Sequence, residues 1–384
     1  RHADDATVTV THSTHKLLAA LSQASMIHIR SGKVPVKPAL FNEAFMMHTS
    51  TSPQYSILAS TDVSAKMMDD AGEYLTDESI GEAIAFRQAM VRLGNEVRKR
   101  KPQDWWFGVW QPDEVNGVPF ADLDPQTLRQ GDAWVLQPSA SWHGFGDLGR
   151  DYCMLDPIKV TVLTPGQTLE GQMEASGIPA PLVSSFLSSR GIVVEKTEPY
   201  SILLLFSLGV TKGKWGSLVA GLMEFKKHYD SNASLELVMP ELVASHGERY
   251  AGMGLKDLAD AMHQDMLASK LLHNMDAAFS LLPDVVSSPR ATFAKLVKGQ
   301  IEQIAVRDML DRTVAVQVVP YPPGIPLMMP GEKAGADKQA IIDYLLAMEL
   351  FDSHFPGFEH DNHGVEIERD GQGGLTYRVY VVKQ

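Results

Sequence analysis

The sequence predicts a mixed α/β fold, and three observations support this fold class. Beyond Asp156-Pro157 the pattern reads strand, helix, strand, strand, helix, which describes a small sheet with helices packed on one face. The chain ends in two strand-like runs around a Gly-rich turn, a pattern typical of a hairpin. The composition, 44% hydrophobic and 21% charged over 384 residues, is that of a soluble globular protein.

The amino-terminal third alternates short strands with helices. The β-branched run 6–11 predicts a strand, and the run 26–29 predicts a second one. A helix is expected over 40–51, because the proline at 53 disfavours helical geometry in the residue before it. A longer helix is expected to begin at Thr76 or Asp77 as N-cap and to end before Pro102, with basic residues in its last turn.

The remaining elements follow from apolar spacing and from Pro and Gly punctuation. A loop-rich, aromatic-rich insertion is expected over 105–151. The predicted strands cover 158–163, 191–195, 201–207, 365–369 and 376–382, and the predicted helices cover 179–189, 214–229, 255–272, 288–298 and 337–351.

Charge and cysteine content exclude several classes of protein. Lys+Arg number 34 and Asp+Glu 47, so the formal net charge is −13, which argues against a partner such as nucleic acid or an anionic membrane. The single cysteine, Cys153, cannot form an internal disulfide, which fits the cytoplasm. The most hydrophobic stretch, 202–210, is far shorter than the roughly 20 residues that a membrane helix needs.

Lys16 is the first candidate for chemistry. It follows a predicted strand, in a loop rich in Ser, Thr and His, where burial beside other cations could lower the pKa of a Schiff-base lysine. On composition alone, a lysine that only faces solvent is several times more common.

The string Thr11-His12-Ser13-Thr14-His15-Lys16-Leu17-Leu18-Ala19-Ala20-Leu21-Ser22-Gln23-Ala24-Ser25 closely resembles the pyridoxal-phosphate lysine signature of the bacterial ornithine/lysine/arginine decarboxylases, which are fold type I, aspartate aminotransferase-like enzymes. Further segments resemble the same family in the same order, and the resemblance is strongest to the inducible lysine and arginine decarboxylases. These segments are 41–53, 142–145, 155–160, 191–197, 320–326 and 355–359. The resemblance therefore extends over essentially the whole chain.

The resemblance implies a role for five residues. Lys16 would be the catalytic residue that carries the cofactor pyridoxal 5′-phosphate as a Schiff base, and Ser13 and His15 would contact its phosphate, for which both are suitable donors. Ser50, in a stretch where the family has threonine, would reach the phosphate of the neighbouring subunit. Glu195 would pair with the distal ammonium of the substrate; without the resemblance, a carboxylate at this position is more often an ordinary charge at a sheet edge.

The resemblance also implies the organisation of the protein. Residues 1–66 would be the carboxy-terminal part of the aspartate aminotransferase-like cofactor domain, and residues 67–384 a carboxy-terminal α+β decarboxylase domain. The start at Arg1 predicts the carboxy-terminal half of such an enzyme, inactive or nearly so alone, with the pyridine-nitrogen and ring-stacking residues upstream; Asp4 and Asp5 lie too close along the strand for that role. The parent would be a homodimer with a shared active site, assembled into a decamer.

The activity implied is decarboxylation of a basic amino acid, with lysine giving cadaverine and CO2 as the first choice. Arginine, giving agmatine, and ornithine, giving putrescine, remain open. A non-catalytic assembly or regulatory subunit is the alternative from another class. A metal-dependent hydrolase built on His354, Glu359, His360, Asp361 and His363 is more remote, because these residues lack regular ligand spacing; no metal is predicted.

Overall fold

The structure is a computed structural model, and it describes residues 6–17, 20–138, 140–150, 152–370 and 374–384. The chain forms two compact units. The first comprises Arg1–Ala85 and Phe206–Lys212, and the second comprises Phe86–Leu205 and Gly213–Gln384. Helices and strands are mixed throughout, as the α/β prediction requires. The domain boundary between residues 66 and 67 stays a prediction.

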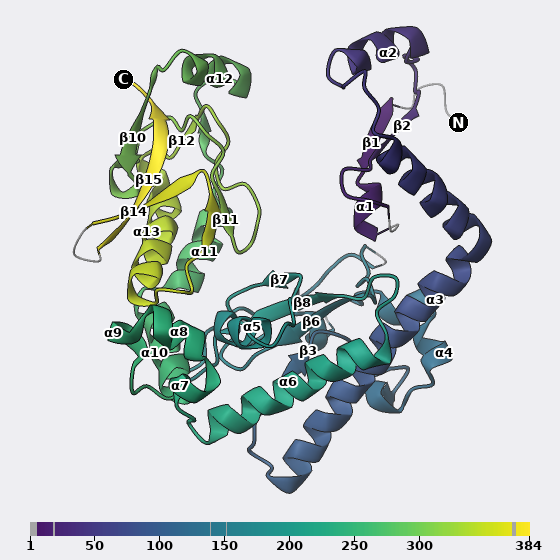
Figure 1. Cartoon of the computed structure of the whole chain (residues 1–384), viewed down its shortest axis with the longest axis vertical. Coiled ribbons are helices and arrows are strands. Elements are labelled where there is room, and N and C mark those ends of the chain that lie inside the picture. Colours follow the sequence, from purple (N-terminus) through teal and green to yellow (C-terminus); the bar gives the residue numbers. More distant parts are fainter. Residues whose placement is uncertain (1–5, 18–19, 139, 151, 371–373) are drawn as a thin grey trace. The chain divides into compact units, whose positions relative to one another are not determined.

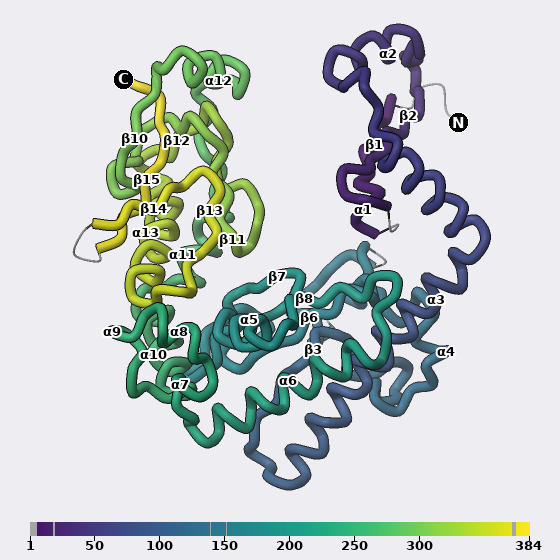
Figure 2. Tube along the Cα trace, viewed as in Figure 1, coloured from purple at the N-terminus to yellow at the C-terminus, as the bar shows by residue number. Residues whose placement is uncertain are grey.

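In the first unit a two-stranded hairpin separates two short helices (Figures 1 and 2). Strand β1 (Val8–His12) pairs antiparallel with β2 (Met26–Arg30), so that Val8 lies opposite Arg30 and His12 opposite Met26. Helix α1 (Thr14–Leu17) follows β1, and helix α2 (Pro38–Met46) lies at the other end of the hairpin. Both strands were predicted, whereas α2 is shorter than the expected helix over 40–51 and begins on a proline, which suits a first helical turn.

Helix α3 (Tyr55–Arg100) is 46 residues long and ends where the basic run predicts. The predicted start at Thr76 is wrong. The Thr76 hydroxyl does not cap a helix; it donates to the carbonyl of Gly72 at 2.8 Å, inside a helix that is already formed. Threonine can make this bond to the preceding turn as readily as it can cap, so the residue type alone did not decide between the two.

The second unit contains a four-stranded antiparallel sheet in the order β3 (Gly108–Val109), β6 (Lys159–Leu163), β8 (Ser201–Leu205), β7 (Lys196–Thr197). Helix α5 (Ala180–Ser188) packs on β7 and β8. Helix α6 (Lys212–Asp230) packs against α5, since the rings of Phe186 and Phe225 lie 5.2 Å apart. The predicted order of strand, helix, strand, strand, helix is confirmed.

The predicted strand over 191–195 is wrong. Gly191 has a left-handed φ of +75° just after α5, and the amide of Ile192 donates back to the carbonyl of Leu187 at 3.0 Å, which closes the helix end. The chain meets the sheet again only at Glu195, whose amide donates to the carbonyl of Leu203 at 2.9 Å. Strand β7 therefore starts one residue after the predicted strand ends.

The aromatic insertion is irregular, as predicted, and Arg87 of α3 ties it to the sheet. Strands β4 (Glu114–Val115) and β5 (Val118–Pro119), helix α4 (Pro125–Leu128) and short 3₁₀ turns make up the insertion. The Arg87 guanidinium is fully buried and donates to the carbonyls of Trp110, Pro157 and Lys159. Burial lowers the pKa of Arg87 to about 9, although the nearby charge of Asp156 acts in the opposite direction. The three carbonyl oxygens that accept hydrogen bonds from the guanidinium therefore stabilise its charged form.

The carboxy-terminal region packs a long helix against a three-stranded sheet. Helix α13 (Gln339–His354) contacts α11 (Leu271–Phe279) and the sheet ordered β10 (Ile301–Ala305), β15 (Leu375–Val382), β14 (Val365–Arg369). The predicted terminal hairpin is therefore confirmed. The remaining elements are α7 (Leu235–Val238), α8 (Pro240–Ser245), α9 (Gly247–Tyr250), α10 (Leu255–Ala268), α12 (Pro289–Val297), β9 (Asp284–Val285), β11 (Val319–Tyr321), β12 (Glu332–Lys333) and β13 (Asp361–His363).

The single helix predicted over 255–272 is two helices. Lys270 adopts a left-handed conformation with φ of +55° between α10 and α11, which interrupts the helical path. Within the residues that the structure describes, no helix is both long and apolar enough to cross a membrane.

Candidate functional site

The predicted lysine site is a tight turn from strand to helix in the first unit. Strand β1 ends at His12, and Lys16 lies in helix α1, where its amide donates to the carbonyl of Ser13 at 3.0 Å. His15 is anchored to the loop before β2, because its Nδ1 lies 2.9 Å from the carbonyl oxygen of Ala24. The turn therefore holds Ser13, His15 and Lys16 together. Leu18 and Ala19 of the signature, like Asp4 and Asp5, lie outside the described residues.

The polar groups of this turn are available to a ligand. Lys16 is exposed, and its ammonium makes no ion pair with any described residue. The Ser13 hydroxyl and Nε2 of His15 likewise make no hydrogen bond within the described part of the chain. Thr14, between them, is buried, and its hydroxyl has no hydrogen-bond partner among the residues that the structure describes. A free amine beside a hydroxyl and an imidazole suits an aldehyde cofactor that carries a phosphate, so these residues fit pyridoxal 5′-phosphate.

Ser50 lies between α2 and α3, in the same unit. Its side chain is exposed, and its Oγ accepts a hydrogen bond from the amide of Ser52 at 3.1 Å. No hydrogen bond among the described residues joins Ser50 to Ser13, His15 or Lys16 of the same chain. The structure thus does not bring Ser50 into the lysine turn of its own chain, and its predicted role in a neighbouring subunit stays a prediction.

Glu195 belongs to the second unit. It is exposed directly before β7, and its carboxylate makes no ion pair or hydrogen bond within the described residues. The next two charged side chains pair with each other, since Lys196 Nζ lies 2.5 Å from Glu198 Oε1. Glu195 therefore keeps an uncompensated negative charge, whereas its assignment to the substrate stays a prediction.

The carboxy-terminal histidines do not gather as the metal alternative requires. Among the described residues no group of three or more metal-type side chains is close enough to hold an ion. His354 Nδ1 lies 2.5 Å from Asp265, and Glu359 pairs with Arg369 at 2.5 Å. His354 and Glu359 are thus each engaged by a different protein partner.

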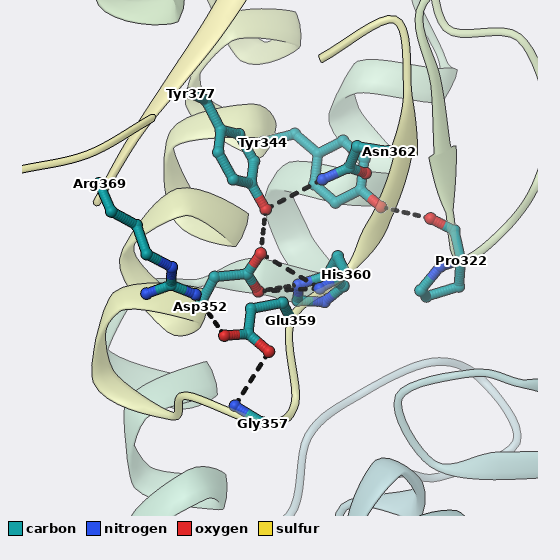
Figure 3. Close-up of polar contacts among 9 residues, drawn as sticks. All are labelled: Pro322, Tyr344, Asp352, Gly357, Glu359, His360, Asn362, Arg369 and Tyr377. Atoms are coloured by element: carbon teal, nitrogen blue, oxygen red, sulfur yellow. Dashed lines mark hydrogen bonds and ion pairs between the residues drawn. The ribbon is translucent and has the colours of Figure 1, made fainter. Parts of the chain in front are cut away.

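His360 instead belongs to a buried polar network that the sequence did not indicate (Figure 3). The Asp352 carboxylate is fully buried and accepts hydrogen bonds from the amide of His360 at 3.1 Å and from the Tyr377 hydroxyl. His360 Nδ1 lies 2.5 Å from Asp352 Oδ1, and Asn362 Nδ2 donates to the Tyr377 hydroxyl oxygen at 2.9 Å. Its members come from α13, β13, β15 and the loop before β13, so only the folded chain brings them together.

Comparison with known families covers both units. Residues 1–214 match the family described as Orn/Lys/Arg decarboxylase, major domain, and residues 272–383 match its C-terminal domain. Lysine decarboxylase LdcA of Pseudomonas aeruginosa is 48% identical over 379 residues, which cover 98% of this chain and 49% of that protein. The biodegradative arginine decarboxylase of Escherichia coli is 44% identical over 94% of this chain and 49% of its own length.

Solved structures agree with these similarities. Lysine decarboxylase A from Pseudomonas aeruginosa matches with a TM-score of 0.88 over 98% of this chain and 49% of that one, at 48% identity. The constitutive lysine decarboxylase of Escherichia coli matches with a TM-score of 0.86 at 41% identity, over 98% of this chain and 50% of that one.

The matches cover nearly all of this chain but only part of each relative. The chain spans about half the length of the curated relatives that it matches. The expectation that it represents the carboxy-terminal half only is not borne out, because the matches extend over the whole of this chain. The predicted family, in contrast, is confirmed by matches that include the lysine turn. The chain belongs to the Orn/Lys/Arg decarboxylase family.

Proposed function

We propose that this chain forms the lysine-bearing part of a pyridoxal-phosphate-dependent decarboxylase of basic amino acids, with L-lysine as the first substrate, giving cadaverine and CO2. The observation that carries the proposal is the turn after β1, where the exposed Lys16 amine, which has no ion-pair partner in the described part of the chain, lies beside Ser13 and His15. A lysine decarboxylase is 48% identical, whereas the arginine decarboxylase is 44% identical and the ornithine decarboxylases are 30% and 31% identical, which supports lysine as the first choice.

Lys16 and Ser13 would bind different parts of the cofactor. Pyridoxal phosphate, when bound, supplies the electron sink for the electrons of the broken Cα–carboxylate bond. Lys16 Nζ would hold the cofactor through its aldehyde carbon and so fix its place in the site. The Ser13 hydroxyl would donate to a phosphate oxygen, and the short helix keeps both groups at one end of β1.

The anchor of His15 determines which form of the ring can bind a phosphate. Its Nδ1 lies 2.9 Å from the carbonyl oxygen of Ala24, which can only accept, so Nδ1 carries a proton. A neutral ring would then present the Nε2 lone pair, which repels a phosphate oxygen. Nε2 could donate to a phosphate oxygen only if both ring nitrogens carried a proton, with Nδ1 still bound to the carbonyl of Ala24.

The test of this proposal follows the cofactor and the product separately. After pyridoxal phosphate is added, we expect an absorbance band near the visible edge, and after borohydride reduction, mass spectrometry should find the pyridoxyl group on Lys16. Diamine release is then measured with lysine, arginine and ornithine as competing substrates. Attachment at another lysine would contradict the proposed site, and a preference for arginine or ornithine would contradict the proposed substrate.

Glu195→Gln tests the recognition of the distal ammonium of lysine. The variant removes one exposed carboxylate that has no partner among the described residues, so we expect kcat/KM for lysine to fall by roughly 30-fold, mainly through KM, as one charge-assisted contact of about 2 kcal/mol is lost. Steady-state kinetics give the two constants. Glu170→Gln, at another exposed carboxylate of the same unit that makes no ion pair with a described residue, is the matched control and should change neither. Equal effects of both variants would remove Glu195 from the substrate site.

We further propose that the enzyme is a cytoplasmic homodimer with a shared active site, in which Ser50 of one copy donates to the phosphate held by Lys16 of the other, and that dimers assemble into a decamer. The proposal is supported by the exposed position of Ser50 outside the lysine turn of its own chain. At a cofactor concentration too low to saturate Ser50→Ala, mixing this variant with Lys16→Arg should restore about a quarter of the native activity, since half of the dimers are mixed and one of the two sites in each mixed dimer receives both native residues. No recovery after subunit exchange would show that Ser50 does not act across subunits.

A further inference from the structure

The second unit contains a cavity of about 240 Å³ at one end of its four-stranded sheet. Its walls come from the end of β6, from the start of β8, from the loop 164–171 and from the aromatic insertion, all within that unit. We propose that this cavity is a ligand site for a small uncharged aromatic molecule that carries one hydroxyl group. The proposed decarboxylation makes no use of these residues.

The Thr164 hydroxyl is the polar group that indicates a ligand. Thr164 directly follows β6, lines the cavity and is only 4% exposed. Its amide donates to the carbonyl of Tyr200 at 2.9 Å, which fixes its backbone at the edge of the sheet. Its Oγ1 is buried and has no hydrogen-bond partner among the residues that the structure describes. A buried hydroxyl without a partner is destabilising, and a ligand hydroxyl in the cavity would supply the missing hydrogen bond.

Two other polar side chains of the cavity wall already have protein partners. The Tyr200 hydroxyl lies 2.6 Å from Nδ1 of the buried His263, and Nε2 of Gln167 donates to the carbonyl of Gly171 at 3.2 Å. Neither group needs a ligand to complete its hydrogen bonding. The unmet hydrogen bond of Thr164 therefore determines what polar group a ligand should carry: one that can pair with a hydroxyl.

The cavity is uncharged. No Asp, Glu, Lys or Arg side chain is among the described residues that line it, and its one imidazole belongs to the buried His143. Nε2 of His143 lies 2.9 Å from the carbonyl oxygen of Gln137, which can only accept, and Nδ1 accepts from the amide of Phe145 at 3.0 Å. The ring therefore carries one proton, on Nε2, and is neutral. A charged ligand would lose its hydration here without gaining an ionic partner, so the cavity favours an uncharged one.

Aromatic and leucine side chains form the apolar walls. The rings of Trp110 and Phe145 meet edge to face with centroids 5.9 Å apart, and Phe145 is stacked on His143 at 5.8 Å. Phe145 is nevertheless 60% exposed, so one part of its ring is still free to pack against a ligand. Leu163 and Leu169 complete the apolar lining. Aromatic rings pack well against other rings in these geometries, so the cavity suits a flat ring with one hydroxyl group.

The test compares phenol with toluene, which has nearly the same shape but no hydroxyl group, by calorimetry on the whole chain without added cofactor. Phenol should bind at one site and about fivefold more tightly than toluene, which is the effect of one neutral hydrogen bond. Thr164→Val replaces the hydroxyl with a methyl group and should remove that preference without changing the affinity for toluene. Thr161→Val, at a threonine of β6 that does not line the cavity, is the matched control and should keep the preference. Benzoate, which is charged, should not bind.

Three further measurements separate binding in the cavity from other effects. Phe145→Ala, at an exposed wall residue, should weaken phenol and toluene alike by about fivefold. Lys16→Ala should bind phenol as tightly as the native chain. Without ligand, Thr164→Val should unfold at a higher urea concentration than the native chain, because an apolar group replaces a buried hydroxyl that has no described partner. The proposal is overturned if phenol binds no more tightly than toluene, if Thr164→Val keeps the preference or unfolds at a lower urea concentration, or if Lys16→Ala abolishes phenol binding.

Discussion

Replacing Lys16 with arginine is expected to lower decarboxylation by at least about 1,000-fold in the enzyme that carries this sequence, which is the scale seen when a covalent catalytic group is removed. Arginine keeps the positive charge, but its guanidinium stays protonated and cannot attack the cofactor aldehyde. Absorbance of the bound cofactor and diamine release should be lost together. Since Lys16 is exposed and makes no ion pair with the described residues, the variant should fold normally.

Lys37→Arg provides the matched control for Lys16→Arg. Lys37 is an exposed lysine of the same unit, directly before α2, and its replacement changes the same chemical group. Full activity in Lys37→Arg together with its loss in Lys16→Arg would assign the effect to the position. If Lys16→Arg retained more than a tenth of the native rate, the chain would have to hold the cofactor through another residue.

The lysine turn could be predicted from the sequence because its residues are contiguous. Ser13, His15 and Lys16 span four positions, so the strand that ends at His12 and the turn after it are enough to place them together. The same holds for the sheet in the second unit, where strands β6 and β8 show clear apolar runs. In these segments the residues next to each other in the sequence are also the ones in contact, so the sequence pattern was enough to predict the structure.

The errors occur where one residue type serves two structural purposes. Thr76 has the side chain of an N-cap, yet it bonds to the previous helical turn. The apolar run after Gly191 resembles a strand, but Val193 is 85% exposed and the chain is still leaving α5. Lys270 adopts a left-handed conformation that nothing in its residue type favours. In each of these segments the conformation depends on contacts with residues distant in the sequence, and a short stretch of sequence does not show those contacts.

The Asp352 network could not be predicted, because its members meet only through tertiary packing. Asp352 lies in α13, His360 in the following loop and Tyr377 in β15. The grouping of histidines and carboxylates over 354–363 made His360 a remote candidate for a metal ligand, whereas its partner is a carboxylate eight residues earlier. The residue that organises the network, Asp352, is fully buried and gives no pattern of its own.

Asp352→Ala is expected to lower the free energy of unfolding of the second unit by about 3–5 kcal/mol, the usual cost of removing one member of a buried charged pair. The buried amide of His360, His360 Nδ1 and the Tyr377 hydroxyl would lose their common acceptor at a site with little access to water. Burial, reinforced by the Asp352 charge, raises the pKa of Tyr377 far above its usual range, so its hydroxyl remains a donor and cannot replace the lost carboxylate. Urea unfolding, with hydrogen exchange in β15, measures the loss.

Two further variants separate the charge of Asp352 from its shape. Tyr377→Phe removes one donor and leaves the carboxylate bound to His360, so a loss of about 1–2 kcal/mol is expected. Asp352→Asn keeps the shape but points an N–H group at donors, and its loss should therefore lie between those of Tyr377→Phe and Asp352→Ala. If all three variants cost the same, the Tyr377 hydrogen bond alone would account for the stability of the network, and the buried carboxylate would contribute nothing beyond it.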